Sequence, residues 1–262
     1  MPAAALPAAL DRAADALRAA RRVAVLTGAG VSAESGVPTF RAADGLWEGH
    51  RIEDVATPTG FRKDPALVWQ FYNARRANVG QVRPNPGHYA LAALERHFDG
   101  AFTLVTQNVD GLHLAAGSRN VFEIHGSLRR TRCLGCGVVA DRGLEVLAAL
   151  PRCPACDGPL RPDIVWFNEA LPPAVFEAAT NAAHGCDVFL VVGTSAVVYP
   201  AADLIPVAKG HRDYKPTPGV VVECNLARTE ASRLADIGVY GPSGETLPQL
   251  CARLGLAVGG PA

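Results

Sequence analysis

The chain has 262 residues, 25 basic and 25 acidic side chains, and a formal net charge of zero. A chain of this length exceeds the usual size of a single core, so we expect one large domain with a smaller one attached. Zero net charge removes the electrostatic argument for a nucleic-acid or membrane-surface partner. No apolar run approaches the roughly 18 residues that a membrane span requires. We therefore expect a cytoplasmic protein with no membrane partner and no direct nucleic-acid partner.

The first 20 residues are rich in alanine, and Leu6, Leu10 and Leu17 predict an amphipathic helix rather than a leader peptide. Beyond this helix, short β-branched runs recur at residues 22–27, 102–106, 121–124, 187–192, 220–224 and 237–240. Helical patterns separate several of the runs, at residues 86–98, 173–183 and 227–235. Continuous apolar strands that alternate with helices indicate an α/β fold with a doubly wound, Rossmann-like parallel sheet. Ligands of such sheets bind beyond the carboxyl ends of the strands.

Two segments interrupt this alternation. Residues 42–85 show no strand pattern and look helical, with Leu67, Val68 and Phe71 on one face. Residues 129–165 contain two cysteine doublets. We expect the helical insert and a zinc ribbon to form one small domain. Residues 1–41, 86–128 and 166–262 then form the large domain.

The doublets are Cys133 with Cys136 and Cys153 with Cys156, and 16 residues separate them. This spacing is typical of a four-thiolate zinc site, whereas reduced core cysteines would explain neither the spacing nor the neighbouring Gly and Pro. Four thiolates fill the tetrahedral coordination of zinc and leave no position for water, so the site is structural rather than catalytic. The remaining cysteines, 186, 224 and 251, lie in apolar surroundings and indicate free thiols in a reducing compartment.

A glycine-rich loop, residues 28–33, follows the first predicted strand and fits the relaxed G-x-G-x-x-G/A pattern of a dinucleotide-binding turn. A standard dehydrogenase also places an acidic residue about 20 positions further on, at the end of a second strand. Glu48 has that offset, but no strand precedes it. The loop therefore predicts nucleotide binding without a standard hydride transfer.

Polar residues follow the next two predicted strands. Gln107, Asn108 and Asp110 come after the run at 102–106, where they would serve equally well as ligand contacts or as turn and helix-capping residues. His125 follows the run at 121–124 and precedes Gly126. Histidine exchanges a proton near neutral pH more readily than any other side chain, so His125 is a candidate acid–base residue.

These segments together resemble the sirtuin family of NAD-dependent protein lysine deacylases, from about residue 22 to residue 250. The matching motifs are GAGVSAESG from residue 28, TFR from 39, TQNVDGLH from 106, HGS from 125, both cysteine doublets and GTS from 193. The resemblance implies NAD as co-substrate and one structural zinc. It implies cofactor contacts at Gly28, Ala29, Gly30, Ser32, Ala33, Thr39, Phe40, Arg41, Trp47, Gln107, Asn108, Asp110, His125, Gly193, Thr194, Ser195, Asn225, Leu226 and Ser243.

The resemblance also implies the reaction. The acyl-lysine amide oxygen attacks the ribose carbon of NAD as nicotinamide leaves, and Asn108 with Asp110 resembles the pair that forms the nicotinamide pocket. His125, as general base, then activates a ribose hydroxyl. The products are nicotinamide, free lysine and O-acyl-ADP-ribose, so His125 and Asn108 are the expected catalytic residues.

The pair Tyr72 and Arg75 is spaced to share one face of a helix, which on pattern alone favours an ordinary amphipathic helix. The pair also resembles the class III sirtuin branch, of bacterial deacetylases and desuccinylases, where it binds the carboxylate of succinyl- or malonyl-lysine. Val165 and Phe167 resemble residues that pair with an extended substrate peptide and line the acyl-lysine tunnel. Two positions depart from the family pattern: Asn168 replaces a common glycine, and Ala227 replaces a common acidic residue.

Three other functions would explain parts of this sequence. A hydride-transfer oxidoreductase would lack its ribose-binding acid and would have no use for Asn108 and Asp110. A zinc-ribbon nucleic-acid module would present a basic face, which zero net charge does not favour. An ADP-ribosyltransferase stays open, because the same cleavage of NAD would deliver ribose to a protein side chain.

Overall fold

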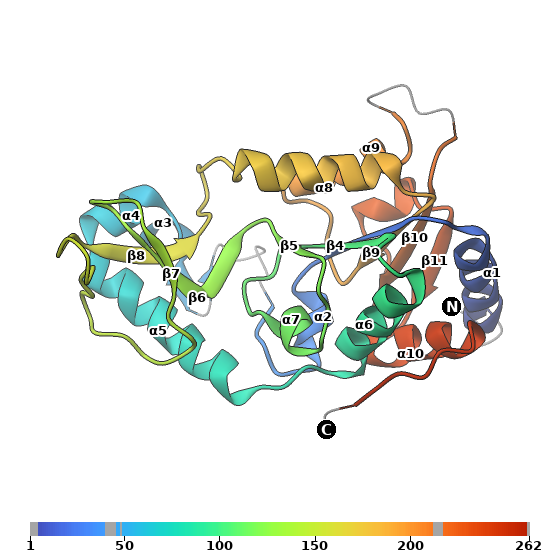
Figure 1. Ribbon diagram of the computed structural model, residues 1–262, viewed down its shortest axis with the longest axis horizontal. Helices are drawn as coiled ribbons and strands as arrows, with labels where there is room; N and C mark the ends of the chain where they lie inside the picture. Colours follow the sequence, from blue (N-terminus) through green and yellow to red (C-terminus); the bar gives the residue numbers. More distant parts are fainter. Residues whose placement is uncertain (1–4, 40–45, 48, 212–216, 261–262) are drawn as a thin grey trace.

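The computed structural model describes residues 5–39, 46–47, 49–211 and 217–260. Figure 1 shows a large lobe built on a parallel sheet and a smaller lobe at the opposite end of the long axis. In none of the described ranges is there a helix with the length and apolarity needed to cross a bilayer. The elements are α1 (Ala5–Ala19), β1 (Val23–Thr27), α2 (Gly30–Ala33), β2 (Leu46–Trp47), β3 (His50–Arg51), α3 (Ile52–Val55), α4 (Pro58–Lys63), α5 (Pro65–Gln81), α6 (Pro86–Phe98), β4 (Phe102–Thr106), α7 (Leu112–Ala115), β5 (Val121–Glu123), β6 (Gly126–Cys133), β7 (Val139–Asp141), β8 (Leu160–Ile164), α8 (Pro173–Gly185), β9 (Val188–Val192), η2 (Ala201–Asp203), α9 (Leu204–Ala208), β10 (Val220–Asn225), η3 (Glu230–Arg233), β11 (Ile237–Tyr240) and α10 (Ser243–Arg253).

The large lobe contains a six-stranded sheet in the order β11-β10-β9-β1-β4-β5, and every neighbouring pair in it is parallel. The chain builds outward from β1 through β4 to β5 and then returns to the other side of β1 to add β9, β10 and β11. This is the doubly wound order that the alternating strands and helices predicted, so the predicted fold class is confirmed. The direction of winding reverses between β1 and β9, and the crevice at the carboxyl ends of these two strands is where such folds bind ligands.

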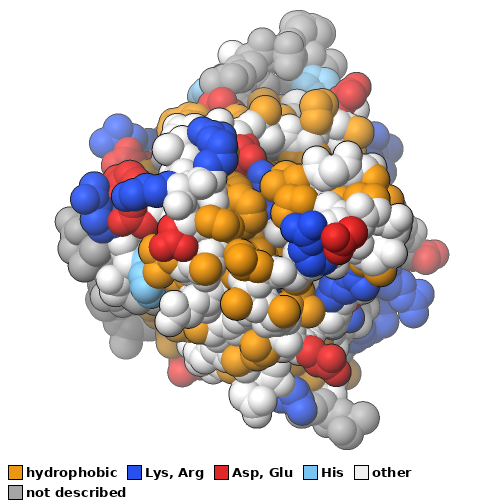
Figure 2. Space-filling model, turned by 90° about the vertical axis from the view of Figure 1, so that its left-hand side faces the viewer, with side chains coloured by type: hydrophobic (Ala, Val, Ile, Leu, Met, Phe, Trp, Pro, Cys, Tyr) orange, Lys and Arg blue, Asp and Glu red, His pale blue; other side chains and the backbone are white. Residues whose placement is uncertain are grey.

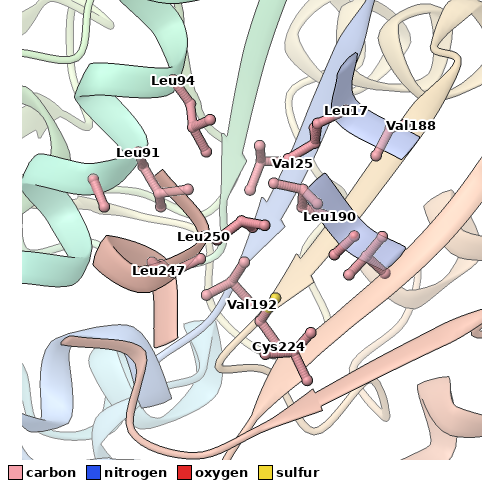
Figure 3. Packing of buried hydrophobic residues seen from close by; sticks show 14 of the residues in the cluster. Leu17, Val25, Leu91, Leu94, Val188, Leu190, Val192, Cys224, Leu247 and Leu250 are labelled. Carbon is pink, nitrogen blue, oxygen red and sulfur yellow. The ribbon is translucent and has the colours of Figure 1, made fainter. Parts of the chain in front are cut away.

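The apolar strands bury both faces of the sheet because alternate residues point to opposite sides. In β1, Val23 and Val25 pack on one side with α1, α6 and α10, and Ala24 and Leu26 pack on the other with α8 and α9. Figure 3 shows the first of these cores, where leucines of the three helices meet Val25 and the valines of β9. Helices therefore cover both faces of the sheet and fix the positions of the strands.

The small lobe combines the helices of the insert with a three-stranded antiparallel sheet in the order β7-β6-β8. One core joins the two parts, since Val68, Trp69 and Phe71 of α5 pack with Leu128 and Leu160 of the ribbon strands. The indole of Trp69 also donates a hydrogen bond to the Leu160 carbonyl at 3.1 Å. The predicted association of insert and ribbon is therefore observed, while the exact domain boundaries stay a prediction.

Two predicted features of the secondary structure are wrong. The helix predicted over residues 227–235 is only the short 3-10 helix η3, because Thr229 and Ser232 point back to β10 and bond to the buried carboxylate of Glu223. The insert, predicted to hold no strand, contains the two-residue antiparallel strands β2 and β3. The N-terminal helix is confirmed, with Leu10 and Leu17 buried against the sheet.

Figure 2 views the end of the molecule that carries the small lobe. Hydrophobic side chains gather in the middle of this face, and basic and acidic side chains are interspersed around them. The large hydrophobic side chains of the ribbon that are exposed include Leu134, Val138, Val146 and Leu150.

Candidate active site and zinc centre

A cavity of about 460 Å³ lies between the two lobes, at the carboxyl ends of the central strands. The large lobe contributes the loops after β1, β4, β9 and β10, and the small lobe contributes α5 and the segment after β8. The predicted residues that line the cavity are Gly28, Ala29, Gly30, Thr39, Tyr72, Arg75, Gln107, Asn108, Asp110, His125, Val165, Phe167, Gly193, Thr194, Ser195 and Asn225. Segments far apart in the sequence thus meet at one site.

The loops after β1 and β9 are in direct backbone contact at the point where the sheet reverses its winding. A β-carbon on Gly28 would lie 2.7 Å from Thr194 Cβ, and one on Gly30 would lie 2.7 Å from the Gly193 oxygen. The Gly30 amide donates to that same oxygen at 2.8 Å. Glycine is required at these positions because any side chain would force the loops apart.

Asn108 and Asp110 belong to a buried hydrogen-bond network centred on Ser32. The Ser32 hydroxyl donates to Asp110 Oδ2 at 2.8 Å, and Asn108 Nδ2 donates to the Ser32 oxygen at 3.1 Å. The other Asp110 oxygen accepts the Leu112 amide at 2.9 Å. Burial raises the pKa of Asp110, and these bonds to its charged form partly oppose the rise. The network fixes both side chains at the cavity wall.

His88 completes this network, and sequence reasoning gave it no role. Asn85 caps α6, and its backbone amide donates to His88 Nδ1, so His88 carries its proton on Nε2, which lies 3.3 Å from Ser32 Oγ. The Ser32 hydroxyl is therefore free to donate to Asp110. Burial lowers the pKa of His88 to about 4, which keeps its ring neutral. No short-range sequence pattern predicts this contact, because 56 residues separate His88 from Ser32.

His125 follows β5 and is half-buried, with its ring against the cavity. Its Nδ1 lies 3.0 Å from the Gln107 carbonyl oxygen. A carbonyl only accepts, so Nδ1 carries the proton and Nε2 presents a lone pair. Burial lowers the pKa of His125, and the bond to Gln107 partly opposes this. The ring is thus a neutral base with one fixed orientation.

Tyr72 and Arg75 lie one turn apart on α5, which Asp64 caps by accepting the Leu67 amide at 2.9 Å. Both side chains line the cavity, and both are buried, at 1% and 8% exposure. Burial raises the pKa values of Tyr72 and Asp110, and the positive charge of Arg75 lies close enough to oppose both rises in part. Arg75 therefore places a positive charge on the small-lobe side of the cavity.

The segment after β8 joins the lobes across the cavity. The Val165 amide donates to the His125 carbonyl at 2.9 Å, and the Phe167 amide donates to the Ala56 carbonyl at 3.0 Å. Asn168 has a φ of +67°, in the left-handed region. Glycine adopts this conformation without strain, and asparagine adopts it more readily than other side chains that have a β-carbon.

Several residues predicted to contact the cofactor are not among those that line the cavity. Ser32 and Ala33 sit in α2, behind the cavity wall, and Leu226 is 69% exposed outside the lining. Ser243 begins α10, where its hydroxyl donates to Glu34 at 2.9 Å. Residues 40 and 41 (Phe and Arg) lie outside the described part of the chain, as does the side chain of residue 47 (Trp). The contacts predicted for these residues stay predictions.

The four ribbon cysteines converge, with all four Sγ atoms within 4.8 Å of one another. Cys133 and Cys156 are 3.5 Å apart, and Cys136 and Cys153 are 3.8 Å apart. Sulfurs on a tetrahedral zinc, with bonds of about 2.3 Å, stand ~3.8 Å from one another. Backbone amides of Gly135 and Cys136 point at the Cys133 sulfur, which favours the thiolate. The donor set fits one structural zinc.

Comparison with known proteins gives the family. Residues 28–200 match the model of the Sir2 family. The chain is 49% identical to the NAD-dependent protein deacylase 2 of Pyrobaculum aerophilum over 239 residues, which cover 90% of this chain and 92% of the relative.

Solved structures agree with this match. A Sir2 homologue in complex with NAD is 42% identical, with a TM-score of 0.85, and the match covers 93% of each chain. Sir2Af2 bound to a myristoylated histone peptide is 33% identical, with a TM-score of 0.75, over 95% of this chain and 97% of the other. The order of motifs, the parallel sheet, the four-cysteine centre and these matches agree, and the chain belongs to the class III branch of the Sir2 family, the NAD-dependent protein deacylases.

Proposed function

We propose that this protein uses NAD to remove succinyl and malonyl groups, as well as acetyl groups, from protein lysines. The products are nicotinamide, free lysine and O-acyl-ADP-ribose. The observation that supports this proposal is the shared cavity: the neutral base His125 and the amide of Asn108 line it together with the Tyr72–Arg75 pair. Chemistry and acyl recognition would then occur in one cavity.

Residues of the large lobe would hold NAD across the reversal of the sheet. The loop from Gly28 to Gly30 would face the pyrophosphate, Thr194, Ser195 and Asn225 the ribose and adenine, and Asn108 with Asp110 the nicotinamide. Bound NAD supplies a ribose carbon that accepts the acyl oxygen as nicotinamide leaves. The network through Ser32 would keep the Asn108 and Asp110 side chains from rotating as the substrate enters.

His125 would act as the general base on a ribose hydroxyl. Its Nδ1–H is committed to the Gln107 carbonyl, so the lone pair of Nε2 is the one available to take a proton. Its lowered pKa keeps the ring unprotonated near neutral pH. Bonding to a backbone carbonyl also prevents the ring from flipping.

Tyr72 and Arg75 would bind the carboxylate at the end of a succinyl or malonyl chain. A guanidinium offers a planar donor fork that matches a carboxylate, and the phenol adds one hydrogen bond. Because both groups are buried, the interaction would be screened little by water. An acetyl group has no carboxylate and would not use the pair.

The substrate would be an acylated lysine in an extended peptide. Val165 and Phe167 lie in the segment that bridges the lobes, and pairing with backbone groups tolerates many sequences. A peptide complex of a relative, Sir2Af2, supports this class of substrate. A cytoplasmic location and the absence of nucleic-acid binding remain predictions.

The test is one incubation of the zinc-loaded protein with NAD and matched acetyl-, succinyl- and malonyl-lysine peptides, read by mass. The variant Arg75→Met should lower kcat/KM for the acidic acyl peptides at least tenfold more than for the acetyl peptide. Arg62→Met, which removes an exposed guanidinium from the same lobe, is the matched control. Equal losses on all three peptides would contradict the proposed acyl recognition.

The same incubation separates deacylation from ADP-ribosyl transfer. With NAD labelled in its adenine, the label should appear in a small molecule that carries the acyl group. Label attached to the protein or peptide would instead identify an ADP-ribosyltransferase.

A further inference from the structure

The indole N–H of Trp166 donates a hydrogen bond to the hydroxyl oxygen of Tyr72 at 2.9 Å. The two residues lie 94 positions apart, on the segment after β8 and on α5. Both are buried, at 3% and 1% exposure, and both line the cavity. Tyr72 therefore accepts a hydrogen bond from Trp166 and also lines the cavity that the acyl chain would fill.

A donor on the Tyr72 oxygen determines what the hydroxyl itself does. An indole N–H only donates, so the phenolic proton cannot point at Trp166 and must turn to another acceptor. Burial raises the pKa of Tyr72 to about 12, so the hydroxyl keeps this proton throughout the neutral range. Tyr72 thus reaches the cavity as a hydrogen-bond donor, which is the character that a carboxylate requires.

Trp166 is itself held in place from several sides. The Arg161 guanidinium lies 3.5 Å from the centroid of the Trp166 ring and forms two hydrogen bonds with Glu169, at 2.6 and 2.9 Å. Glu169 also accepts the Trp166 backbone amide at 2.9 Å. The ring of Phe61 packs against the indole, with centroids 5.2 Å apart. Such a locked side chain is suited to orient a neighbour.

We propose that Trp166 is a positioning residue for acidic acyl groups: its indole N–H turns the Tyr72 hydroxyl into a donor aimed at the acyl carboxylate. The inference rests on the proposed role of Tyr72 and Arg75. Trp166 acts here through Tyr72, while its own ring forms part of the cavity wall.

The test is Trp166→Phe, which keeps an aromatic ring and removes the N–H. The ratio of kcat/KM for succinyl-lysine to that for acetyl-lysine peptide should fall about fivefold, as expected for one lost neutral hydrogen bond. The fall should appear mainly in the KM for the succinyl peptide. The matched control is Trp69→Phe, which removes another buried indole donor from the same core, one that donates to the Leu160 carbonyl and not to the Tyr72 hydroxyl. This control should shift the ratio less than twofold.

A double-mutant cycle separates positioning from a general loss of packing. In a Tyr72→Phe background there is no hydroxyl to orient, so Trp166→Phe should change the ratio no further. Additive effects of the two substitutions, or an unchanged ratio in the single Trp166→Phe variant, would overturn the inference. If Trp166→Phe does not fold, the same ratio is measured in Arg161→Lys. This variant loses the two-pronged guanidinium that binds Glu169 and so loosens the support of Trp166.

These variants also distinguish a failure of the positioning role of Trp166 from a failure of the proposed acyl recognition. If Tyr72→Phe and Arg75→Met lower the ratio and Trp166→Phe does not, only the positioning role fails. If neither Tyr72→Phe nor Arg75→Met changes the ratio, the recognition of acidic acyl groups fails and the role of Trp166 with it.

Discussion

The Nδ1 atom of His125 lies 3.0 Å from the carbonyl oxygen of Gln107, and this contact determines which ring nitrogen can accept a proton. Gln107 is held in turn, because its side-chain amide donates to Thr194 Oγ1 at 2.9 Å. The loops after β4 and β9 thereby orient the imidazole that follows β5.

A first prediction concerns the pH dependence of turnover. A base works only when unprotonated, and burial lowers the pKa of His125 from its usual 6.5. Activity is therefore retained as the pH falls to 6.5 and is lost as it falls through the lower pKa of the folded protein. The acidic limb of kcat/KM should have its midpoint below pH 6.5. A midpoint above pH 7 would contradict the assignment, and His97→Gln, on an exposed histidine of α6, should leave the profile unchanged.

A second prediction separates binding from chemistry at the same residue. His125→Ala should lower turnover by at least two orders of magnitude, the usual contribution of a general base. NAD binding, measured by calorimetry, should change less than threefold, because the predicted contacts to the pyrophosphate and adenine lie on other loops. Parallel losses of binding and turnover would assign His125 to cofactor binding alone.

A third prediction concerns acid stability. His88 and His113 are buried, and burial lowers the pKa of each well below 6.5, in His88 to about 4. Below pH 6.5 the two imidazoles bind protons in the unfolded chain but stay neutral in the folded protein. The free energy of unfolding therefore falls with falling pH. His88 contributes at most ~1.4 kcal/mol per pH unit between about pH 6.5 and pH 4, and His113 contributes in the same direction.

The measurement is urea unfolding from pH 7.5 to pH 5, compared with His88→Gln, which cannot titrate. The variant should show a slope of stability against pH that is shallower by roughly 1 kcal/mol per unit. Comparing the two proteins cancels the contribution of the zinc thiolates, which both share. Parallel curves would show that His88 does not resist protonation.

A fourth prediction concerns the zinc. Cys133 and Cys153 belong to the same core as Tyr72, so losing the metal should loosen the small lobe before the sheet. Removing zinc with a chelator should abolish peptide turnover while NAD binding to the large lobe falls less than tenfold. Metal analysis should give one zinc per chain before treatment. Full turnover by metal-free protein would contradict a structural role.

A fifth prediction concerns Asn168. Its φ of +67° strains any residue with a β-carbon, though least for asparagine. Asn168→Gly should be as stable as the original protein or slightly more stable, and Asn168→Ala should cost about 1 kcal/mol. Thermal melting checks both. An alanine variant as stable as asparagine would show that backbone conformation does not explain the residue found here.

The sheet was predictable from the sequence because its strands are buried on both faces. Continuous apolar runs such as Val188–Val192 have few alternatives to a central parallel strand, and the structure confirms the prediction. The zinc site was equally predictable, because the spacing of its cysteine ligands is visible within a short stretch of sequence.

The failures arose where distant contacts decide the structure. Residues 227–235 have a helical pattern, yet the Glu223 carboxylate accepts Thr229 and Ser232 and also Tyr240, at 2.7 Å. These bonds stabilise a tight turn instead of a longer helix. The contacts of His88 with Ser32, and of Trp166 with Tyr72, likewise join residues 56 and 94 positions apart, which no window of sequence reveals.

The crossing of the loops after β1 and β9 limits how this crevice could be redesigned. Gly28, Gly30 and Gly193 touch one another's backbones, so enlarging any of them pushes the opposite strand end out of line. An engineer who wants a different dinucleotide, or a synthetic analogue, has to leave these three positions untouched. Room for new selectivity exists at their neighbours Ala29 and Ser195, which line the same cavity and are half-buried and exposed, respectively.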